Sequence, residues 1–237
     1  MSLLEVRGLD SWYGDFQALF GIDLDLYAGE VVAIIGANGA GKTTFMRSLT
    51  GLNSVSSEAI RFNGRPIGGL EPFNVVKLGI ALVPEGRRLF PSLTVEENLL
   101  IGGHSRRKGP WDLSSVYQLF PALRERRHTP ATAMSGGQQQ MVAIGRALMS
   151  NPTVLLCDEL SLGLSPRLIR QIYEALVRIV GQGVAVLLVE QDIGQAMRVS
   201  SRLYCFQEGR VSLKGSPLDL TREQVSSAYF GMNQLAH

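Results

Sequence analysis

Residues 33–44, AIIGANGAGKTT, decide the fold. They contain the pattern G-x-x-x-x-G-K-[ST], which is typical of a loop that binds phosphate. Glycines let the backbone bend so that successive N–H groups point at phosphate oxygens, and a following helix adds its positive N-terminal end. The β-branched run EVVAIIGA before the loop predicts a strand buried on both faces. A helix should follow from near Lys42 to a stop at Gly51.

This phosphate loop, residues 36–43, predicts binding of a nucleoside triphosphate. Lys42 should reach the β- and γ-phosphates, and the Thr43 hydroxyl should ligate Mg²⁺. The expected nucleotide contacts are Gly36, Ala37, Asn38, Gly39, Ala40, Gly41, Lys42, Thr43 and Thr44. By itself the loop leaves kinases, GTPases, motors and transport ATPases open.

The composition narrows the class of protein. The 237 residues fit one compact domain or one domain with a lobe. They are 45% hydrophobic with a net charge of +2, which gives no sign of a nucleic-acid partner. Cys157 and Cys205 lie in apolar runs, which indicates buried thiols rather than a disulfide framework. No apolar run approaches the roughly 20 residues of a membrane span, and the N-terminus lacks a secretory pattern. We expect any membrane association to come through a partner.

The rest of the chain predicts an α/β fold. The stretches LLEVRGLD, FGIDLDLY and AIRFNGRPI are typical of an antiparallel sheet with short turns. TVLLCDE and VAVLLVEQD are typical of buried parallel strands, and the amphipathic stretch between them predicts a crossover helix. From about Leu93 to Ser150 the patterns TVEENLLIGG, SSVYQLFPALRERR and QQQMVAIGRALMS predict a helical insertion.

Two further clusters suggest chemistry. Asp158 and Glu159 end the strand TVLLCDE, where Asp158 suits Mg²⁺ and Glu159 suits a general base that polarises water, although an acidic N-cap or a solvated turn would look alike. Ser135, Gly136 and Gly137 precede a helix expected to begin near Gln138, and they resemble a second anion cradle. An ordinary N-cap would explain Ser135 alone.

Together these motifs resemble the ATP-binding subunits of ABC transporters. Residues 134–138, MSGGQ, match that family's LSGGQ signature with Met in place of Leu, and TVLLCDE matches its Walker B strand with the catalytic glutamate. The resemblance covers residues 4–231. It implies a Mg²⁺-dependent ATPase with the catalytic residues Glu159, Gln191 and Lys42. The Mg²⁺ ligands that it implies are Asp158, Thr43 and Glu85.

The resemblance also implies an architecture and a second subunit. The chain would be a single ABC ATP-binding domain, with a RecA-like P-loop NTPase core and antiparallel β lobe at about 1–92 and 151–237. The helical lobe would span about 93–150. Ser135, Gly136, Gly137 and Gln138 would close over the γ-phosphate of ATP bound to a second subunit.

Tyr13 matches the aromatic residue that stacks on adenine in this family, with a core aromatic as the alternative. Its neighbour Trp12 would face the other way on a strand.

Three positions depart from the general family pattern. Glu85 replaces a usual Gln, Gln191 replaces a usual His, and Leu160 replaces the proline after the catalytic glutamate. An amide at Gln191 can position phosphate but cannot carry a proton as imidazole does. The loss of the proline predicts a looser loop after Glu159.

The stretches VPEGRRLFPSLTVEENL, MSGGQQQMVAIGRALM, SLGLSP and VEQ resemble the ATP-binding subunits of branched-chain amino acid importers, in which Glu and Gln are usual at positions 85 and 191. Leu160 is unusual even in those subunits. Urea or short-amide import and a soluble non-transport ATPase are the alternatives. The resemblance implies permease subunits, a homo- or heterodimeric ATP-binding partner, a periplasmic solute-binding protein, and a place on the cytoplasmic face of the cell membrane. Solute specificity resides in other subunits.

Two basic runs, HSRRKGPW and RERRH, are most often solvated faces. The resemblance suggests instead that this lobe and Glu85 dock a permease helix, with Phe90, Pro91 and Leu93 as apolar contacts that are equally compatible with a core.

Overall fold

The computed structural model describes residues 2–231, which form two compact units. The first unit comprises Met1–Val75 with Ala185–His237, and the second comprises Val76–Val184. The expected helical lobe, about 93–150, falls inside the second unit. In the described part of the chain, no helix is both long enough and apolar enough to cross a membrane.

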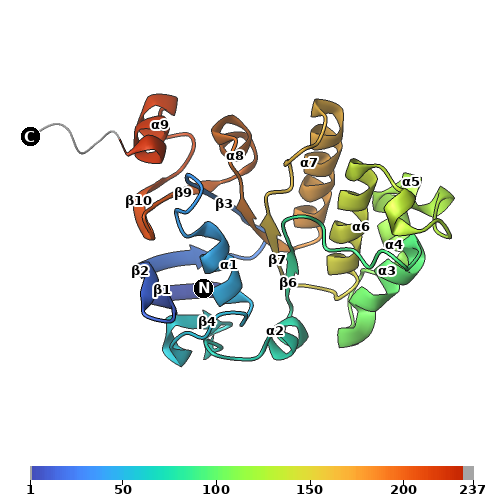
Figure 1. Cartoon of the computed structure of the whole chain (residues 1–237), viewed down its shortest axis with the longest axis horizontal. Helices are drawn as coiled ribbons and strands as arrows, with labels where there is room; N and C mark the ends of the chain where they lie inside the picture. Colours follow the sequence, from blue (N-terminus) through green and yellow to red (C-terminus); the bar gives the residue numbers. More distant parts are fainter. Residues whose placement is uncertain (1, 232–237) are drawn as a thin grey trace, which may run out of the picture. The chain divides into compact units, whose positions relative to one another are not determined.

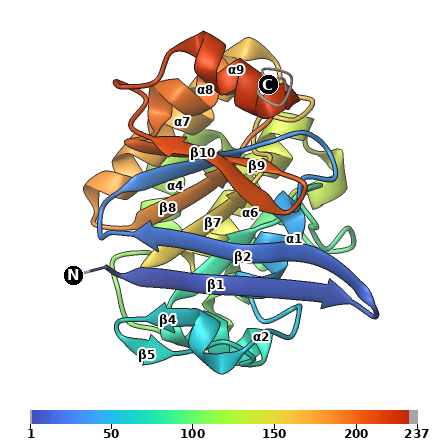
Figure 2. The same ribbon diagram turned by 90° about the vertical axis from the view of Figure 1, so that its left-hand side faces the viewer.

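The first unit contains the predicted antiparallel sheet, which runs in the order β2-β1-β4-β5. Its strands are β1 (Leu4–Tyr13), β2 (Phe16–Leu26), β4 (Ile60–Phe62) and β5 (Arg65–Pro66). Figure 2 shows β1 and β2 as two long neighbouring ribbons, with the shorter β4 beside β1. This sheet places Tyr13 at the far end of the first hairpin.

A second set of strands in the first unit has the order β10-β9-β3-β8. Its strands are β3 (Val31–Ile35), β8 (Ala185–Val189), β9 (Arg202–Gln207) and β10 (Arg210–Gly215). β3 pairs in parallel with both β8 and β9, which is why the run before the phosphate loop is apolar on both faces. The phosphate loop therefore leaves the centre of a buried parallel set.

Helices complete the first unit. They are α1 (Lys42–Leu49), α8 (Ile193–Val199) and α9 (Arg222–Phe230), with a short 3-10 turn at Ser57–Ala59, while α2 (Pro72–Leu78) runs across the boundary of the units. Figure 1 shows α9 next to β9 and α8 next to β3. Ala196 of α8 and Val225 of α9 are fully buried in a cluster that includes Cys205. The predicted buried thiol at Cys205 is confirmed.

The second unit pairs two parallel strands with five α-helices among its described residues. They are β6 (Ile80–Val83), β7 (Val154–Asp158), α3 (Val95–Gly102), α4 (Leu113–Leu119), α5 (Pro121–Glu125), α6 (Gly136–Leu148) and α7 (Pro166–Gly181), with 3-10 turns at Gly103–Ser105 and Ala131–Ala133. The predicted helical insertion and crossover helix are confirmed. The stretch SSVYQLFPALRERR divides at Phe120 because Pro121 cannot continue a preceding helix.

Candidate functional site

Neighbouring atoms leave no room for a side chain at two glycines of the phosphate loop. A methyl group on Gly36 would lie 2.4 Å from the Phe206 carbonyl oxygen, and one on Gly41 would lie 2.7 Å from Leu19 Cδ2. Gly39 also has a positive φ, of +82°, but it differs in that the space around its Cα is open. The two ends of the loop are therefore held against the unit's own core, and its middle is accessible.

Lys42 lies across the phosphate loop. Its Nζ donates to the carbonyl oxygens of Gly36 at 2.6 Å and Ala37 at 3.0 Å, and the residue is 5% exposed. The first turn of α1 contains no acidic side chain, so the positive end of the helix is not neutralised locally. A buried ammonium beside a left-handed glycine loop and an uncompensated helix end fit the polyphosphate of a nucleotide.

Gln191 lies at the same edge as the phosphate loop. Parallel pairing of Ile34 with Val189 brings the carboxyl ends of β3 and β8 together, and Gln191 follows β8 by two residues. Its Nε2 donates to Asn38 Oδ1 at 3.5 Å. The sequence marked both residues as candidates but contained no signal for this contact.

Tyr13 is half-exposed, which does not fit the alternative of a core aromatic. Its hydroxyl lies 3.4 Å from Thr44 Oγ1 on α1, so the ring is tied to the helix that follows the phosphate loop. Phe16, its cross-strand partner, is 70% exposed and is a second aromatic at this position that sequence reasoning missed. Trp12 is also half-exposed.

The second unit brings Glu85 to the same edge as Asp158 and Glu159. Val83 at the end of β6 pairs in parallel with Cys157 on β7, so both loops begin side by side at the carboxyl ends of the strands. Such edges are where open α/β sheets bind ligands. Asp158 is 5% exposed and Glu85 is exposed.

The sequence predicts that Glu159 is part of the strand, but in the structure it lies just beyond it. β7 ends at Asp158, and Glu159 has a left-handed φ of +50°. A non-glycine residue in this conformation is strained, and such strain clusters at functional sites. Leu160 is fully buried, so burial of its side chain fixes the chain directly after Glu159 without the usual proline.

Ser135 forms a complete capping box at the start of α6. Its Oγ accepts from the Gln138 backbone N–H at 3.4 Å, and its own N–H donates to Gln138 Oε1 at 3.1 Å. α6 therefore begins at Gly136, two residues before the expected start. A methyl group on Gly137 would lie 2.4 Å from Leu168 Cδ1, so packing against α7 explains that glycine.

Gly136 faces a cation that the sequence analysis did not single out. A methyl group on Gly136 would lie 3.1 Å from Nη2 of Arg87. The first turn of α6 has no acidic side chain. The signature loop, residues 135–137, therefore combines an ordinary N-cap with a positively charged edge.

Each unit offers a hard oxygen donor of the kind that binds Mg²⁺ together with a nucleotide. Among residues 2–231, no group of three or more His, Cys, Asp or Glu side chains forms a metal site by itself. Thr43 provides an exposed hydroxyl and Asp158 a carboxylate, which are hard oxygen donors. Mg²⁺ is commonly held by one or two such groups together with waters and substrate phosphates.

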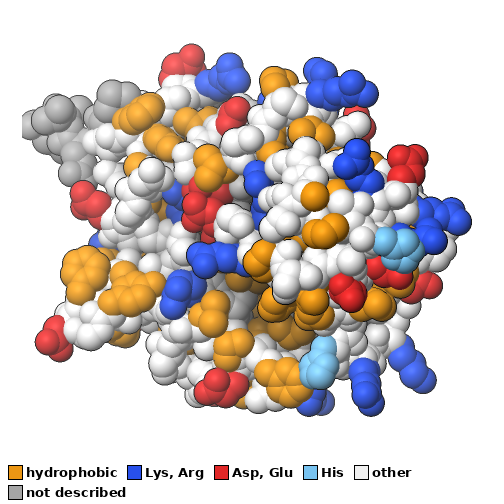
Figure 3. All heavy atoms as spheres, turned by 45° about the vertical axis from the view of Figure 1, so that its right-hand side comes forward, with side chains coloured by type: hydrophobic (Ala, Val, Ile, Leu, Met, Phe, Trp, Pro, Cys, Tyr) orange, Lys and Arg blue, Asp and Glu red, His pale blue; other side chains and the backbone are white. Residues whose placement is uncertain are grey.

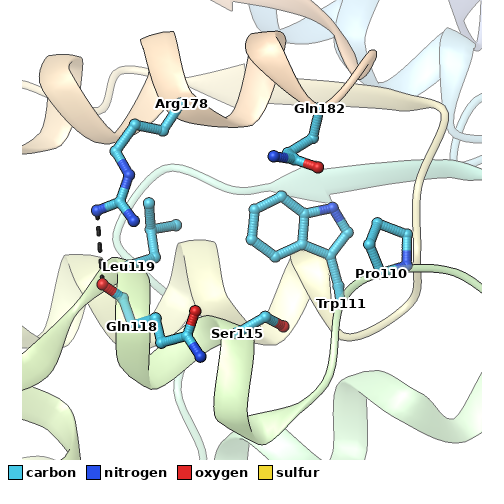
Figure 4. A pocket seen from close by; sticks show the side chains of 7 residues that line it. All are labelled: Pro110, Trp111, Ser115, Gln118, Leu119, Arg178 and Gln182. Atoms are coloured by element: carbon cyan, nitrogen blue, oxygen red, sulfur yellow. Dashed lines mark hydrogen bonds between the residues drawn. The ribbon is translucent and has the colours of Figure 1, made fainter.

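A separate cavity of about 230 Å³ lies in the second unit. Figure 4 shows Trp111 between side chains of α4 and α7, with Arg178 donating to the Gln118 carbonyl oxygen at 3.5 Å. The lining residues are Pro110, Trp111, Ser115, Gln118, Leu119, Arg178 and Gln182. No predicted site residue lines it.

On the face drawn in Figure 3, blue Lys and Arg side chains alternate with red acidic and orange apolar ones. Arg107 is partly buried, and its guanidinium donates to the carbonyls of Lys77, Leu78 and Asn151 and to the Thr153 hydroxyl. Exposed Phe90 and Pro91 are not core residues, and Leu93 is partly buried.

Comparison with known proteins gives consistent relatives. The family described as ABC transporter matches residues 19–161. The high-affinity branched-chain amino acid transport ATP-binding protein BraG of Pseudomonas aeruginosa is 44% identical, over 97% of this chain and all of that protein. The probable branched-chain amino acid transport ATP-binding protein LivF of Archaeoglobus fulgidus is 33% identical, over 94% of this chain and 95% of that protein.

A solved structure supports the same fold. The ADP conformation of an ATP-binding cassette from an ABC transporter aligns with a TM-score of 0.78 at 28% identity, covering 96% of this chain and 94% of that chain. The predicted α/β P-loop NTPase fold is thus confirmed, with nucleotide binding as a family property.

Proposed function

The chain belongs to the ABC transporter family of ATPases, and from that premise we propose that it energises import of branched-chain amino acids. The observation that carries the solute class is the full-length identity of 44% with BraG. The departures at Glu85 and Gln191 support it, because they resemble those of branched-chain amino acid importers.

The roles of the residues follow from their chemistry. The phosphate loop and Lys42 bind and neutralise the polyphosphate, and Gln191 orients the γ-phosphate as a neutral hydrogen-bond donor. Thr43 and Asp158, with Glu85 nearby on the Asp158 edge, would hold Mg²⁺, which supplies charge neutralisation when it is bound with ATP. Glu159 polarises the attacking water. Phosphoryl transfer of this kind depends mainly on positioning and charge stabilisation.

Two subunits would close on two nucleotides, with each signature loop facing the ATP of the other subunit. ATP binding then drives closure, and loss of phosphate reopens the dimer. We propose that this cycle acts on transmembrane permease subunits at the cytoplasmic face of the cell membrane, with a periplasmic solute-binding protein delivering the solute. The second ATP-binding subunit is another copy or a paralogue.

Glu159→Gln tests the catalytic part of this proposal. The variant should bind ATP and form a stable dimer, while turnover falls by about 100-fold or more because the general base is lost. Glu174→Gln, an exposed acid on α7, is the matched control and should stay within about twofold of the parent. Parent-like hydrolysis by Glu159→Gln would contradict the assignment of the base.

The solute is tested in cells. Deletion of the gene should abolish uptake of labelled leucine, isoleucine and valine, and the parent chain should restore it while Glu159→Gln should not. Tagged chain purified from native membranes in mild detergent should bring permease subunits with it. Intact leucine uptake with lost urea or amide uptake would overturn the solute class, and soluble partners alone would overturn the transport role.

A further inference from the structure

The segment of residues 84–90 has an unusual backbone. Gly86, Arg87 and Arg88 follow one another with left-handed φ values of +72°, +65° and +45°. Two consecutive non-glycine residues adopt this conformation only where their surroundings over-determine it. Something other than local preference must therefore hold the chain after Glu85 in this shape.

Arg146 of α6 supplies that restraint. Its Nη1 donates to the Arg88 carbonyl at 2.8 Å, its Nη2 donates to the Arg87 carbonyl at 3.1 Å, and its guanidinium lies 5.7 Å from the centre of the Phe90 ring. The side chain of Asn98 on α3 accepts a hydrogen bond from the Phe90 N–H and donates one to the Phe90 carbonyl. The end of the segment is thus attached to α6 and α3, while Gly86 next to Glu85 remains exposed.

The Arg87 side chain makes a second connection, to the opposite end of α6. Its Nη1 donates to Gln139 Oε1 at 3.3 Å, and Gln139 Nε2 donates to the Met134 carbonyl at 3.1 Å. Met134 directly precedes the signature loop, and the guanidinium also lies against Gly136. One chain of contacts therefore links the residue two after Glu85 to both sides of Ser135.

Local stability does not explain this placement. A cation beside the N-terminal end of a helix opposes the positive end of the helix dipole. Within the described residues, the ion pairs do not include Arg87, so no carboxylate offsets that repulsion. Arg88 has the same charge and a similar backbone, yet its side chain is exposed. The two arginines therefore form a natural comparison.

We propose that Arg87 is a positioning residue that makes the placement of the signature loop depend on the placement of the Glu85 segment, through Gln139. A displacement of residues 84–88 is carried along the guanidinium to Gln139, and from there to the backbone before Ser135. This inference rests on the proposed function, because it takes the roles of Glu85 and of residues 135–137 from there.

The test compares Arg87→Ala with Arg88→Ala in the full chain assembled with its permeases. Both variants lose one arginine at a left-handed position. Arg87→Ala should lower kcat for ATP about tenfold, a typical effect for one lost positioning contact, and Arg88→Ala should keep the parent value. Affinity for a fluorescent ADP analogue should stay within about twofold in both, because Lys42 and its loop belong to the other unit.

Two further variants separate positioning from folding. Arg87→Lys keeps a long cationic donor and should recover a large part of the lost kcat. In a Gln139→Ala background, Arg87→Ala should cause little further loss, because both residues act through one chain of contacts. Equal losses for Arg87→Ala and Arg88→Ala, or additive losses in the double variant, would overturn the proposal.

Failure of this inference is distinguishable from failure of the proposed function. If Glu159→Gln is inactive while Arg87→Ala turns over ATP like the parent, only the positioning role is wrong. If Glu159→Gln remains active, the assignment of the catalytic base is wrong, whatever the arginine variants do.

Discussion

Asn98 offers the sharpest test of how the Glu85 segment is held. The residue is fully buried on α3, and its Nδ2 donates to the carbonyls of Phe90, Leu93 and Thr94 at 3.1, 3.2 and 2.9 Å. Its Oδ1 accepts from the Phe90 N–H at 2.9 Å. Asn98→Ala removes all four hydrogen bonds at once.

The structure shows which of these losses matter. The Leu93 carbonyl keeps a bond from the Ala131 N–H, and the Thr94 carbonyl keeps the bond from the residue 98 N–H. Water can reach the loop at Phe90, which is 46% exposed. Because an unsatisfied buried group costs about 1–3 kcal/mol and much of this set is compensated, we expect a total of about 2–3 kcal/mol. That corresponds to a fall in Tm of about 4–12 °C for a chain of this size.

The measurement is thermal unfolding of the full chain, with Asn74→Ala as an exposed asparagine control. Asn98→Asp keeps the Oδ1 acceptor but places a carboxylate against three carbonyl oxygens, so it should be less stable than Asn98→Ala at pH 7. Burial raises the pKa of that carboxyl in the folded state, so this penalty should shrink as the pH falls. A Tm for Asn98→Ala equal to that of Asn74→Ala would refute the reasoning.

Two further predictions concern packing and an ion pair. Gly137→Ala should lower stability by about 1–3 kcal/mol through its clash with Leu168, and adding Leu168→Ala should recover part of the lost Tm; no recovery would exclude packing as the reason for this glycine. At Glu30, burial raises the pKa, but bonds from Arg202 and from the Tyr27 N–H outweigh it and leave the pKa lowered. Because a lowered folded pKa stabilises the fold above the unfolded pKa, Glu30→Gln should be less stable than the parent at pH 7. In acid titrations of unfolding, the difference should begin to shrink near the unfolded pKa of about 4 and should be lost as the pH falls through the lower folded pKa.

Much of the site was predictable because its motifs encode local backbone. The glycine pattern of residues 36–41 specifies a bent loop, and the apolar runs before Gly36 and Asp158 specify buried strands. Parallel strands bring their carboxyl ends to one edge, so the positions of Glu85 beside Asp158 and of Gln191 beside the phosphate loop follow once the topology is known.

The contacts that connect distant residues were not predictable. Arg87 meets Gln139 across 52 positions, and Gln191 meets Asn38 across 153 positions. No local propensity records such pairs, because they depend on how whole elements pack. The left-handed backbone of Glu159 was hidden for a related reason, since Glu has no preference for that conformation and only its surroundings impose it.

The glycines of the phosphate loop and the signature loop are needed for different physical reasons, although they belong to similar motifs. Gly36 is required because a methyl group would collide with the backbone carbonyl of Phe206, and Gly137 is favoured because a methyl group would displace the Leu168 side chain, so both answer to the protein's own packing. Gly39 is required by its φ of +82°, and the open space beside it leaves room for a bound ligand. A phosphate-binding pattern therefore combines residues that build the loop with residues that face the phosphate. Substitutions at the first kind should lower stability, and those at the second kind should lower nucleotide affinity.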